Sequence, residues 1–420
     1  MKHIVAFFIF TIFFVPLGNA ETPYLSVKFQ DSDLLKISYT FTAPTTRLAF
    51  KRNPDNSRSS RWNLVSEEFY FFSEDNIEYI SRKDLSAFNH VEIEVPANYT
   101  YLPADYAPFQ PFSDGGMLFH SGRFFACSEQ CSDSDDVWRV TAFPSAGSSI
   151  IFNGEKYNSS ISWEDKADGM NVYHGNSLVI ETAHFIAVID SGMPPPLKTS
   201  LEVAFPTFME YFAEQIGTLD SKPMLFASYG KTGDGRFGRQ GGALPNQVFM
   251  HWYGDNLEEL LTEEGFLEDT NWFFAHEAAH IYQQRSLQTY STDHPWIHEG
   301  FAEIFARQAL LADSGTNREY VDLVASKATT ECLSGLVNTS LSQAALNNSF
   351  ELNYSCGFML HSMVIQKLTA ISSSSDIFDI WQLYHEAINS GVEPTENTYF
   401  GVVSSLTSES FVQELIEIIH

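Results

Sequence analysis

The sequence predicts an α+β protein with more than one domain: a β-sandwich-like N-terminal part, then a mainly helical part with a small β edge. A chain of 420 residues is longer than one typical hydrophobic core accommodates. Before residue 191, short runs rich in Val, Ile, Phe and Tyr alternate with polar turn clusters. After a proline run at residues 194–196, apolar residues recur at helical spacing.

The first twenty residues have the pattern of an export signal. Lys2 precedes an apolar run at residues 4–15, Pro16 ends that run, and small residues lead up to Ala20. This pattern is typical of a secretory signal peptide, and the run is too short to span a bilayer. We expect residues 1–20 to be removed, leaving a mature protein that is secreted or periplasmic and has no membrane anchor.

Residues 21–191 are predicted to form a β-rich N-terminal domain. Regular short strands separated by turns are typical of a sandwich or an open barrel. The strands we expect are residues 34–41, 90–95, 121–126, 137–143 and 178–189. A domain boundary is expected at residues 191–196, because a run of prolines stops regular structure.

The chain after this boundary is predicted to comprise a domain at residues 197–348 and its helical C-terminal part at residues 349–420. Residues 255–269 carry seven acidic side chains with leucines between them, which predicts a solvated helix with one buried face. A Gly-x-Gly-x-x-Gly pattern begins at Gly233, but an extended stretch follows it where a dinucleotide site requires a helix. We therefore expect a Gly-rich loop beside an edge strand.

Charge and cysteine content restrict the partners and the compartment. The formal net charge of −29 argues against a nucleic-acid partner, which requires a basic face. An exported chain with four cysteines is expected to form two disulfides, and three pairings are possible. We favour Cys127–Cys131 and Cys332–Cys356, because they close the two shortest loops.

Residues 273–284 contain the pattern His-Glu-x-x-His, formed by His276, Glu277 and His280. On an α-helix, side chains four positions apart lie on the same face, so two imidazoles can bind one metal ion with the glutamate beside it. This is the arrangement of zinc peptidases, in which the glutamate is the general base. The alternative is a pair of ordinary histidines on an amphipathic helix, which we place at residues 271–285.

A catalytic zinc site usually takes three side chains and leaves one position open. Glu299 follows His280 after eighteen residues and is our third ligand, which gives one Zn²⁺ per chain held by His276, His280 and Glu299. Glu303 lies one helical turn further on, and we expect it to hold a ligand histidine through the other ring nitrogen. The alternative for Glu303 is a surface glutamate.

Three further histidines lie near these motifs. His298 adjoins Glu299 but points about a quarter-turn away on a helix, so we expect a residue at the rim of the site, and His294 is interpreted in the same way. His361 lies one turn beyond Gly357. It either faces the site or lies on a polar helix surface.

The His-Glu-x-x-His pattern, the Glu-Gly-Phe-Ala run from Glu299 and the Tyr-x-x-Gly run from Tyr354 together resemble the gluzincin aminopeptidases. The resemblance is to the aminopeptidase N group and to the glycyl aminopeptidase group, and it covers residues 221–368. It implies a thermolysin-like, mainly helical catalytic domain that follows an N-terminal β domain.

The resemblance also implies roles for individual residues. Tyr354 matches the tyrosine that stabilises the tetrahedral intermediate. The edge strand that binds substrate is matched by Gly242, Ala243, Leu244 and Asn246. The family has a glutamate within this block that anchors the free amino terminus of the substrate, and Pro245 stands there in this chain. Peptide hydrolysis is compatible with this difference, but exopeptidase and endopeptidase activity both remain open.

We therefore expect a secreted zinc peptidase that acts on peptide or protein substrates through a metal-activated water, with Glu277 as general base. Two alternatives remain. One is a non-catalytic binding protein with a structural zinc site, although such a site needs neither Glu277 nor Tyr354. The other is a zinc hydrolase of a non-peptide bond, such as an ester.

Overall fold

The computed structural model describes residues 21–31, 34–99, 102, 107–131, 136–231, 237–283, 294–344, 347, 349–371 and 374–420. The predicted signal peptide lies outside these residues, as does Gly233, where the Gly-rich pattern begins. Within the described ranges, no helix combines the length and the apolar character needed to cross a membrane. The structure confirms the predicted α+β class, with four sheets and eight helices of seven or more residues among the described parts.

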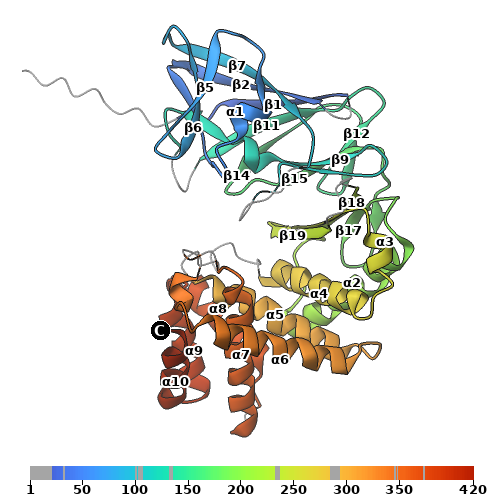
Figure 1. The fold of residues 1–420 in the computed structure, drawn as a ribbon, viewed down its shortest axis with the longest axis vertical. Helices are drawn as coiled ribbons and strands as arrows, with labels where there is room; N and C mark the ends of the chain where they lie inside the picture. Colours follow the sequence, from blue (N-terminus) through green and yellow to red (C-terminus); the bar gives the residue numbers. More distant parts are fainter. Residues whose placement is uncertain are drawn as a thin grey trace, which may run out of the picture.

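The N-terminal β region contains three of these sheets, shown at the top of Figure 1. Their strand orders are β14-β11-β1-β2-β7-β4, β10-β3-β6-β5 and β13-β12-β15-β9-β8. The strands are β1 Tyr24–Asp31, β2 Leu34–Thr45, β3 Arg47–Phe50, β4 Asn63–Leu64, β5 Phe69–Glu74, β6 Ile77–Arg82, β7 Phe88–Pro96, β8 Phe109–Pro111, β9 Met117–His120, β10 Ala126–Ser128, β11 Val137–Phe143, β12 Ser149–Phe152, β13 Glu155–Tyr157, β14 Ile161–Lys166 and β15 Asn171–Gly175.

Alternation of side chains builds the core of this region. In β2, Leu35, Ile37, Tyr39 and Phe41 are buried while the residues between them are more exposed, as expected for a strand with one face on the core. Two expected strands differ from the prediction. Residues 121–124 form a 3₁₀ turn, in which Ser121 Oγ donates to the Asp165 carboxylate and competes with strand pairing.

The other difference is at residues 178–189, where a turn divides the expected single strand into β16 Ile180–Glu181 and β17 Ile186–Ile189. These begin the fourth sheet, which has the order β16-β17-β18-β20-β19 and includes β18 Met224–Gly230, β19 Gly238–Leu244 and β20 Gln247–Tyr253. Strands β17, β18 and β20 are parallel, whereas β19 is antiparallel and lies at the edge.

The fourth sheet separates two cores. Its Phe226 and Phe249 join a cluster with Leu118 and Tyr173 of the β region, while Leu225 and Val248 on the opposite face belong to the helical core. Figure 1 places β19 and α4 between the β region and helices α5 to α10. One face of the fourth sheet thus packs against the β region, and the other packs against the helices.

Buried apolar residues between positions 185 and 419 form one continuous hydrophobic core. The short α1 Arg58–Arg61 lies in the β region. The other helices are α2 Pro195–Ile216, α3 Leu257–Leu260, α4 Phe266–Gln283, α5 Pro295–Ala312, α6 Arg318–Gly335, α7 Leu352–Ala370, α8 Ile377–Asn389, α9 Glu396–Leu406 and α10 Glu409–Ile419. Both predicted cysteine pairs, Cys127–Cys131 and Cys332–Cys356, are joined as disulfides.

The single helix predicted at residues 255–269 is wrong. The structure has α3 and the first turn of α4 there, and Gly265, with a φ of 85°, separates them before α4 begins at Phe266. The helix that carries His276 therefore begins five residues earlier than predicted, and the end predicted at residue 285 lies outside the described residues.

Candidate metal centre

Helix α4 brings two of the predicted ligands together. His276 and His280 lie one turn apart on the same face, with their Nε2 atoms 2.9 Å from each other. The helix is held by Phe274, Ala278 and Ile281, which are buried in the helical core. This burial fixes the direction in which the two imidazoles point.

Helix α5 supplies the third predicted ligand from a distant part of the sequence. The Oε2 atom of Glu299 lies 3.2 Å from His280 Nε2 and 3.4 Å from His276 Nε2. The three ligand atoms lie within 4.8 Å of one another. Two imidazole nitrogens and one carboxylate oxygen that converge in this way are a donor set that suits Zn²⁺, so these residues fit the predicted metal.

The other ring nitrogen of each histidine has a partner. Glu303 Oε1 lies 3.0 Å from His276 Nδ1, and its Oε2 accepts a hydrogen bond of 2.6 Å from Trp272 Nε1. Gln283 Oε1 lies 2.9 Å from His280 Nδ1, while its amide donates to the carbonyl of His298. Partners of this kind fix the ring orientation and leave Nε2 for a metal.

Glu303 was predicted from the sequence, but Gln283 was not. Gln283 lies three residues after His280, on the same helix face, and this spacing was the only signal available for it.

Carboxylates determine the protonation of this cluster in the absence of a metal. Burial alone would lower the pKa of His276, but Glu303 and Glu299 outweigh that effect and hold this pKa well above its ordinary value. Burial would likewise raise the pKa of Glu299, but His280 and His276 hold it well below its ordinary range. The ligand set therefore favours a positive charge at its centre, whether from a proton or from a metal ion.

Glu277 lies beside the ligands in a dry environment. Its side chain is buried, and burial raises the pKa of its carboxyl group, as suits a general base that works near neutral pH. A Cβ added to Gly241 of β19 would lie 2.5 Å from Glu277 Oε1 and would also meet the Phe273 ring. Gly241, which was not predicted from the sequence as a site residue, thus allows the edge strand to approach this carboxylate.

The predicted substrate-binding residues occupy the edge strand and its turn. Gly242, Ala243 and Leu244 are in β19, whose register places Gly242 opposite Phe249 and Leu244 opposite Gln247. Asn246 lies in the turn between β19 and β20, with a φ of 57°, and donates to the carbonyl of Lys222. The structure therefore gives Asn246 a role in the turn.

Tyr354 lies in the first turn of α7, half-buried, with its ring centroid 5.7 Å from that of His276. It lines a pocket of about 380 Å³ together with Glu303, Tyr320 and Phe358. The phenol is thus on the same side of the site as the outer partner of His276.

The remaining histidines have separate environments. His298 Nε2 lies 3.6 Å from Glu299 Oε1, and burial lowers the pKa of His298 to about 4. His294 Nδ1 lies 3.2 Å from a carboxylate oxygen of Glu396. His361 is fully buried between helices, so the polar helix surface offered as one alternative for it is wrong.

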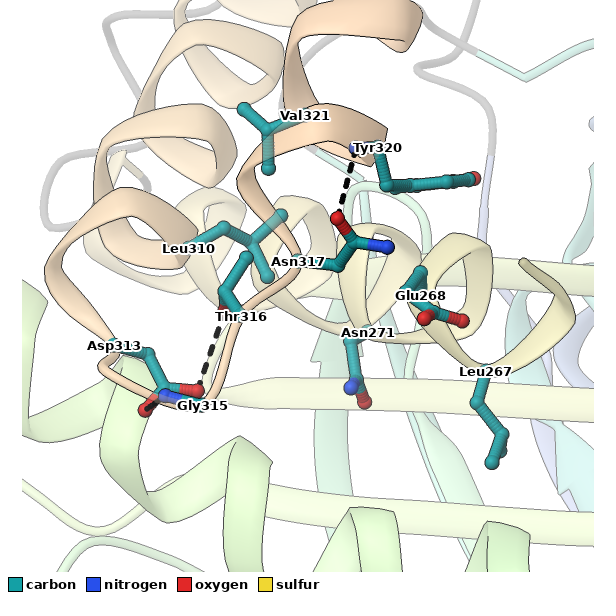
Figure 2. A pocket seen from close by; sticks show the side chains of 10 residues that line it. All are labelled: Leu267, Glu268, Asn271, Leu310, Asp313, Gly315, Thr316, Asn317, Tyr320 and Val321. Atoms are coloured by element: carbon teal, nitrogen blue, oxygen red, sulfur yellow. Dashed lines mark hydrogen bonds between the residues drawn. The ribbon is translucent and has the colours of Figure 1, made fainter. Parts of the chain in front are cut away.

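Figure 2 shows a second, smaller pocket of about 210 Å³ between α4 and the connection from α5 to α6. Asn271 and Glu268 of α4 line it, together with Asp313 and Asn317. None of the predicted ligands or catalytic residues lines this pocket. The larger pocket beside Tyr354 reaches Glu303, the outer partner of His276, but none of the three predicted ligands lines it.

Comparison with known proteins gives structural relatives only. No protein-family model and no curated protein matches the sequence. The aminopeptidase N family protein from Idiomarina loihiensis superimposes with a TM-score of 0.68 at 11% identity, covering 94% of this chain and 76% of that one. The M1 zinc metallopeptidase from Deinococcus radiodurans matches with a TM-score of 0.50 at 10% identity, covering 96% and 94% of the two chains.

A variant of the Deinococcus radiodurans M1 zinc metallopeptidase, solved with a Tyr-Ser-Ala substrate, matches equally well, with a TM-score of 0.50 at 11% identity. At identities this low, a structural match supports a shared fold and does not establish a shared activity. The chain thus has the fold seen in solved structures of the M1 zinc aminopeptidase N family.

Proposed function

We propose that this protein is a zinc-dependent peptidase. The observation that supports this proposal is the convergence of His276, His280 and Glu299 on one point, with the buried carboxylate of Glu277 alongside. A structural zinc site needs no such carboxylate. The two disulfides are consistent with export, and we propose a secreted or periplasmic location.

The proposed chemistry divides between the ion and the chain. A Zn²⁺ bound by the three ligands would supply Lewis acidity at its open side. Glu277 removes a proton from the attacking water and delivers it to the leaving amine. The Tyr354 hydroxyl donates a hydrogen bond to the substrate oxygen that gains negative charge. Glu303 and Gln283 keep the ligand imidazoles oriented throughout.

We propose a peptide as substrate, bound along β19. This strand lies at the edge of its sheet, and an edge strand can pair with an extended peptide through main-chain hydrogen bonds. The Deinococcus radiodurans neighbour was solved with a Tyr-Ser-Ala substrate, which supports the same substrate class. Pro245 offers no carboxylate to hold a free amino terminus, so we propose that the chain does not require one.

Metal analysis combined with peptide cleavage tests the proposal. We expect one zinc ion per chain, loss of cleavage in the metal-free protein, and recovery when zinc is restored. Glu277→Gln should keep its zinc but lose activity by a factor of about 10²–10⁴, the usual contribution of a general base. Full turnover by Glu277→Gln or by the metal-free protein would contradict the proposal.

A second comparison addresses the position of the cut. An internally quenched peptide with a free amino terminus is compared with the same peptide acetylated at that end. We expect the two to be cleaved at similar rates, because Pro245 cannot bind the amino group. Cleavage restricted to the free form would instead indicate an aminopeptidase whose anchor is another residue.

A further inference from the structure

The crossing of α5 and α7 sets the distance between Glu299 and Tyr354. A Cβ on Gly300 would lie 2.5 Å from the Cα of Gly357, and a Cβ on Gly357 would lie 2.6 Å from the Cα of Gly300. The two backbones are therefore in direct contact one residue after Glu299 and three residues after Tyr354. No larger side chain fits at either position without separating the helices.

His361, one turn further along α7, connects this crossing to α9. Its Nε2 lies 3.2 Å from the carbonyl oxygen of Ile297 on α5, and its Nδ1 lies 2.8 Å from the hydroxyl of Tyr399 on α9. The ring also stacks on Phe301, with centroids 4.0 Å apart. Residues 297, 300 and 301 of α5 lie before and after Glu299 in the sequence, so α7 contacts α5 on both sides of this predicted ligand.

The hydrogen bonds assign the tautomer of His361. A carbonyl oxygen can only accept, so Nε2 carries the proton and donates to Ile297. Nδ1 then accepts from the Tyr399 hydroxyl. Burial lowers the pKa of His361 to about 3, which keeps the ring neutral and this arrangement intact at neutral pH.

The start of α7 has a further attachment. Cys356, two residues after Tyr354, is bonded to Cys332 of α6.

The imidazole of His361 contributes more than buried area. An apolar side chain at position 361 would fill the same space without burying two polar nitrogens, but it would form no directional hydrogen bonds to the neighbouring helices. Hydrogen bonds at both ends of a fully buried ring specify one relative placement of the three helices.

We infer that His361 is a positioning residue for Tyr354: it holds α7 against α5 so that the phenol keeps its place relative to the ligand set, and Tyr399 holds His361. This inference rests on the proposed function, because the alignment of Tyr354 affects a rate only where its hydroxyl acts on substrate. It predicts that a change on α9 alters turnover without touching the site.

The experiment compares two hydroxyl deletions on neighbouring rings. Tyr399→Phe removes the donor to His361. Tyr384→Phe is the matched control, because the Tyr384 ring lies 6.3 Å away and its buried hydroxyl has no hydrogen-bond partner among the described residues. We expect Tyr399→Phe to lower kcat by about 5- to 10-fold, the equivalent of one hydrogen bond, with KM and zinc content unchanged. Tyr384→Phe should stay within about twofold of the wild type.

Substitution of His361 itself should have a larger effect. His361→Leu is expected to lower kcat by about 100-fold, the loss that a shift of about 1 Å in a reacting group can cause. His361→Gln retains a donor and an acceptor and should recover part of that loss. Where His361→Leu does not fold, the comparison of Tyr399→Phe with Tyr384→Phe decides the matter.

A double-mutant cycle separates positioning from general destabilisation. In a Tyr354→Phe background, Tyr399→Phe should change kcat by less than about twofold, because the group that it positions is absent. Amide hydrogen exchange in the metal-free protein gives a readout independent of activity. Exchange at residues 297–301 and 352–361 should be faster in Tyr399→Phe and unchanged in Tyr384→Phe.

The outcomes distinguish this inference from the function on which it rests. If the wild type cleaves peptides but Tyr399→Phe matches Tyr384→Phe in both kcat and exchange, His361 does not position Tyr354 and only the inference falls. If the zinc-loaded wild type cleaves no peptide, the proposed function falls, and the role of His361 in turnover falls with it.

Discussion

Two clusters of buried charge, one in the β region and one in the helical region, satisfy their members in different ways. In the β region, Glu78 Oε1 accepts from the backbone N–H of Arg58 at 2.9 Å, and its Oε2 lies 2.5 Å from the Arg58 guanidinium. The guanidinium also donates to the carbonyl of Arg123 and stacks on Phe50 and Trp62. Each charge in this pair is met by another protein group.

The cluster of His276, His280 and Glu299 is not closed in this way. Its ligand atoms face one another at 2.9–3.4 Å, and Glu303 and Gln283 hold the rings from outside. A positive charge at the centre, from a proton or a metal ion, satisfies these three groups together. The comparison teaches that burial of charge does not by itself indicate a binding site, whereas the convergence of three metal-ligating atoms on one point does indicate a candidate.

The largest effects are expected from one substitution in each of the two clusters. Glu78→Gln leaves the Arg58 charge buried without its counter-charge and should lower the free energy of unfolding by about 3–5 kcal/mol, equally with and without zinc. His280→Ala should instead abolish the stabilisation by zinc, which is about 4 kcal/mol in the wild type when free zinc is a thousand times its dissociation constant. Urea unfolding with and without zinc measures both.

If zinc stabilised His280→Ala as much as the wild type, the three convergent side chains would not be the zinc site. If the loss in Glu78→Gln depended on zinc, the two clusters would not be independent.

A smaller effect is expected at the outer partner of His276. Glu303→Gln removes the carboxylate 3.0 Å from Nδ1 and should weaken zinc binding by about 10- to 100-fold, the usual effect of losing such a partner. Glu319→Gln, at an exposed position in α6, is the matched control and should leave the affinity unchanged. Competition with a chelating dye measures both, and equal affinities would contradict the role assigned to Glu303.

The last effect, and the smallest for a change of one pH unit, is the dependence of zinc affinity on pH. The folded-state pKa of His276 lies above its unfolded value, so its protonation stabilises the metal-free protein fully below about pH 6.5, and this contribution is lost as the pH rises through the raised pKa. Zinc needs the neutral ring, so its affinity changes in the opposite sense. It should fall by up to about tenfold for each pH unit below the raised pKa.

Titration of the metal-free protein with zinc at several pH values checks this prediction. An affinity that stays constant between about pH 6 and pH 8 would mean that no proton competes with the metal.

Local spacing allowed much of the site to be predicted. The positions of His276, Glu277 and His280 on one helix follow from the helical repeat alone, and the structure places them as that repeat requires. Glu299 was predicted because a catalytic zinc site needs a third side chain, and the role of Tyr354 came from the resemblance to a known family, because no local pattern joins α5 and α7 to α4. Their proximity to the histidines depends on tertiary packing.

The features that were missed are set by distant contacts. The buried environment of His361 comes from residues 38 and 64 positions away in the sequence, so its helical spacing could not reveal it. A glycine is needed at position 241 because Phe273 and Glu277 lie against it, and both contacts come from a different part of the sequence. In the fold, periodic apolar residues predicted the helical character of residues 349–420, where α7 to α10 form, whereas one positive-φ glycine interrupts the helix predicted at residues 255–269.

The direction of β19 relates the orientation of a bound peptide to the groups at the two ends of the strand. A peptide that pairs with β19 in the antiparallel sense runs in the same direction as β20, from the Leu244 end toward the Gly238 end. Residues on the amino side of the cleaved bond would then meet the turn at Pro245 and Asn246, and residues on its carboxyl side would meet Arg239. For antiparallel pairing, the direction of β19 thus sets which end of the substrate lies near Pro245 and Asn246 and which end lies near Arg239.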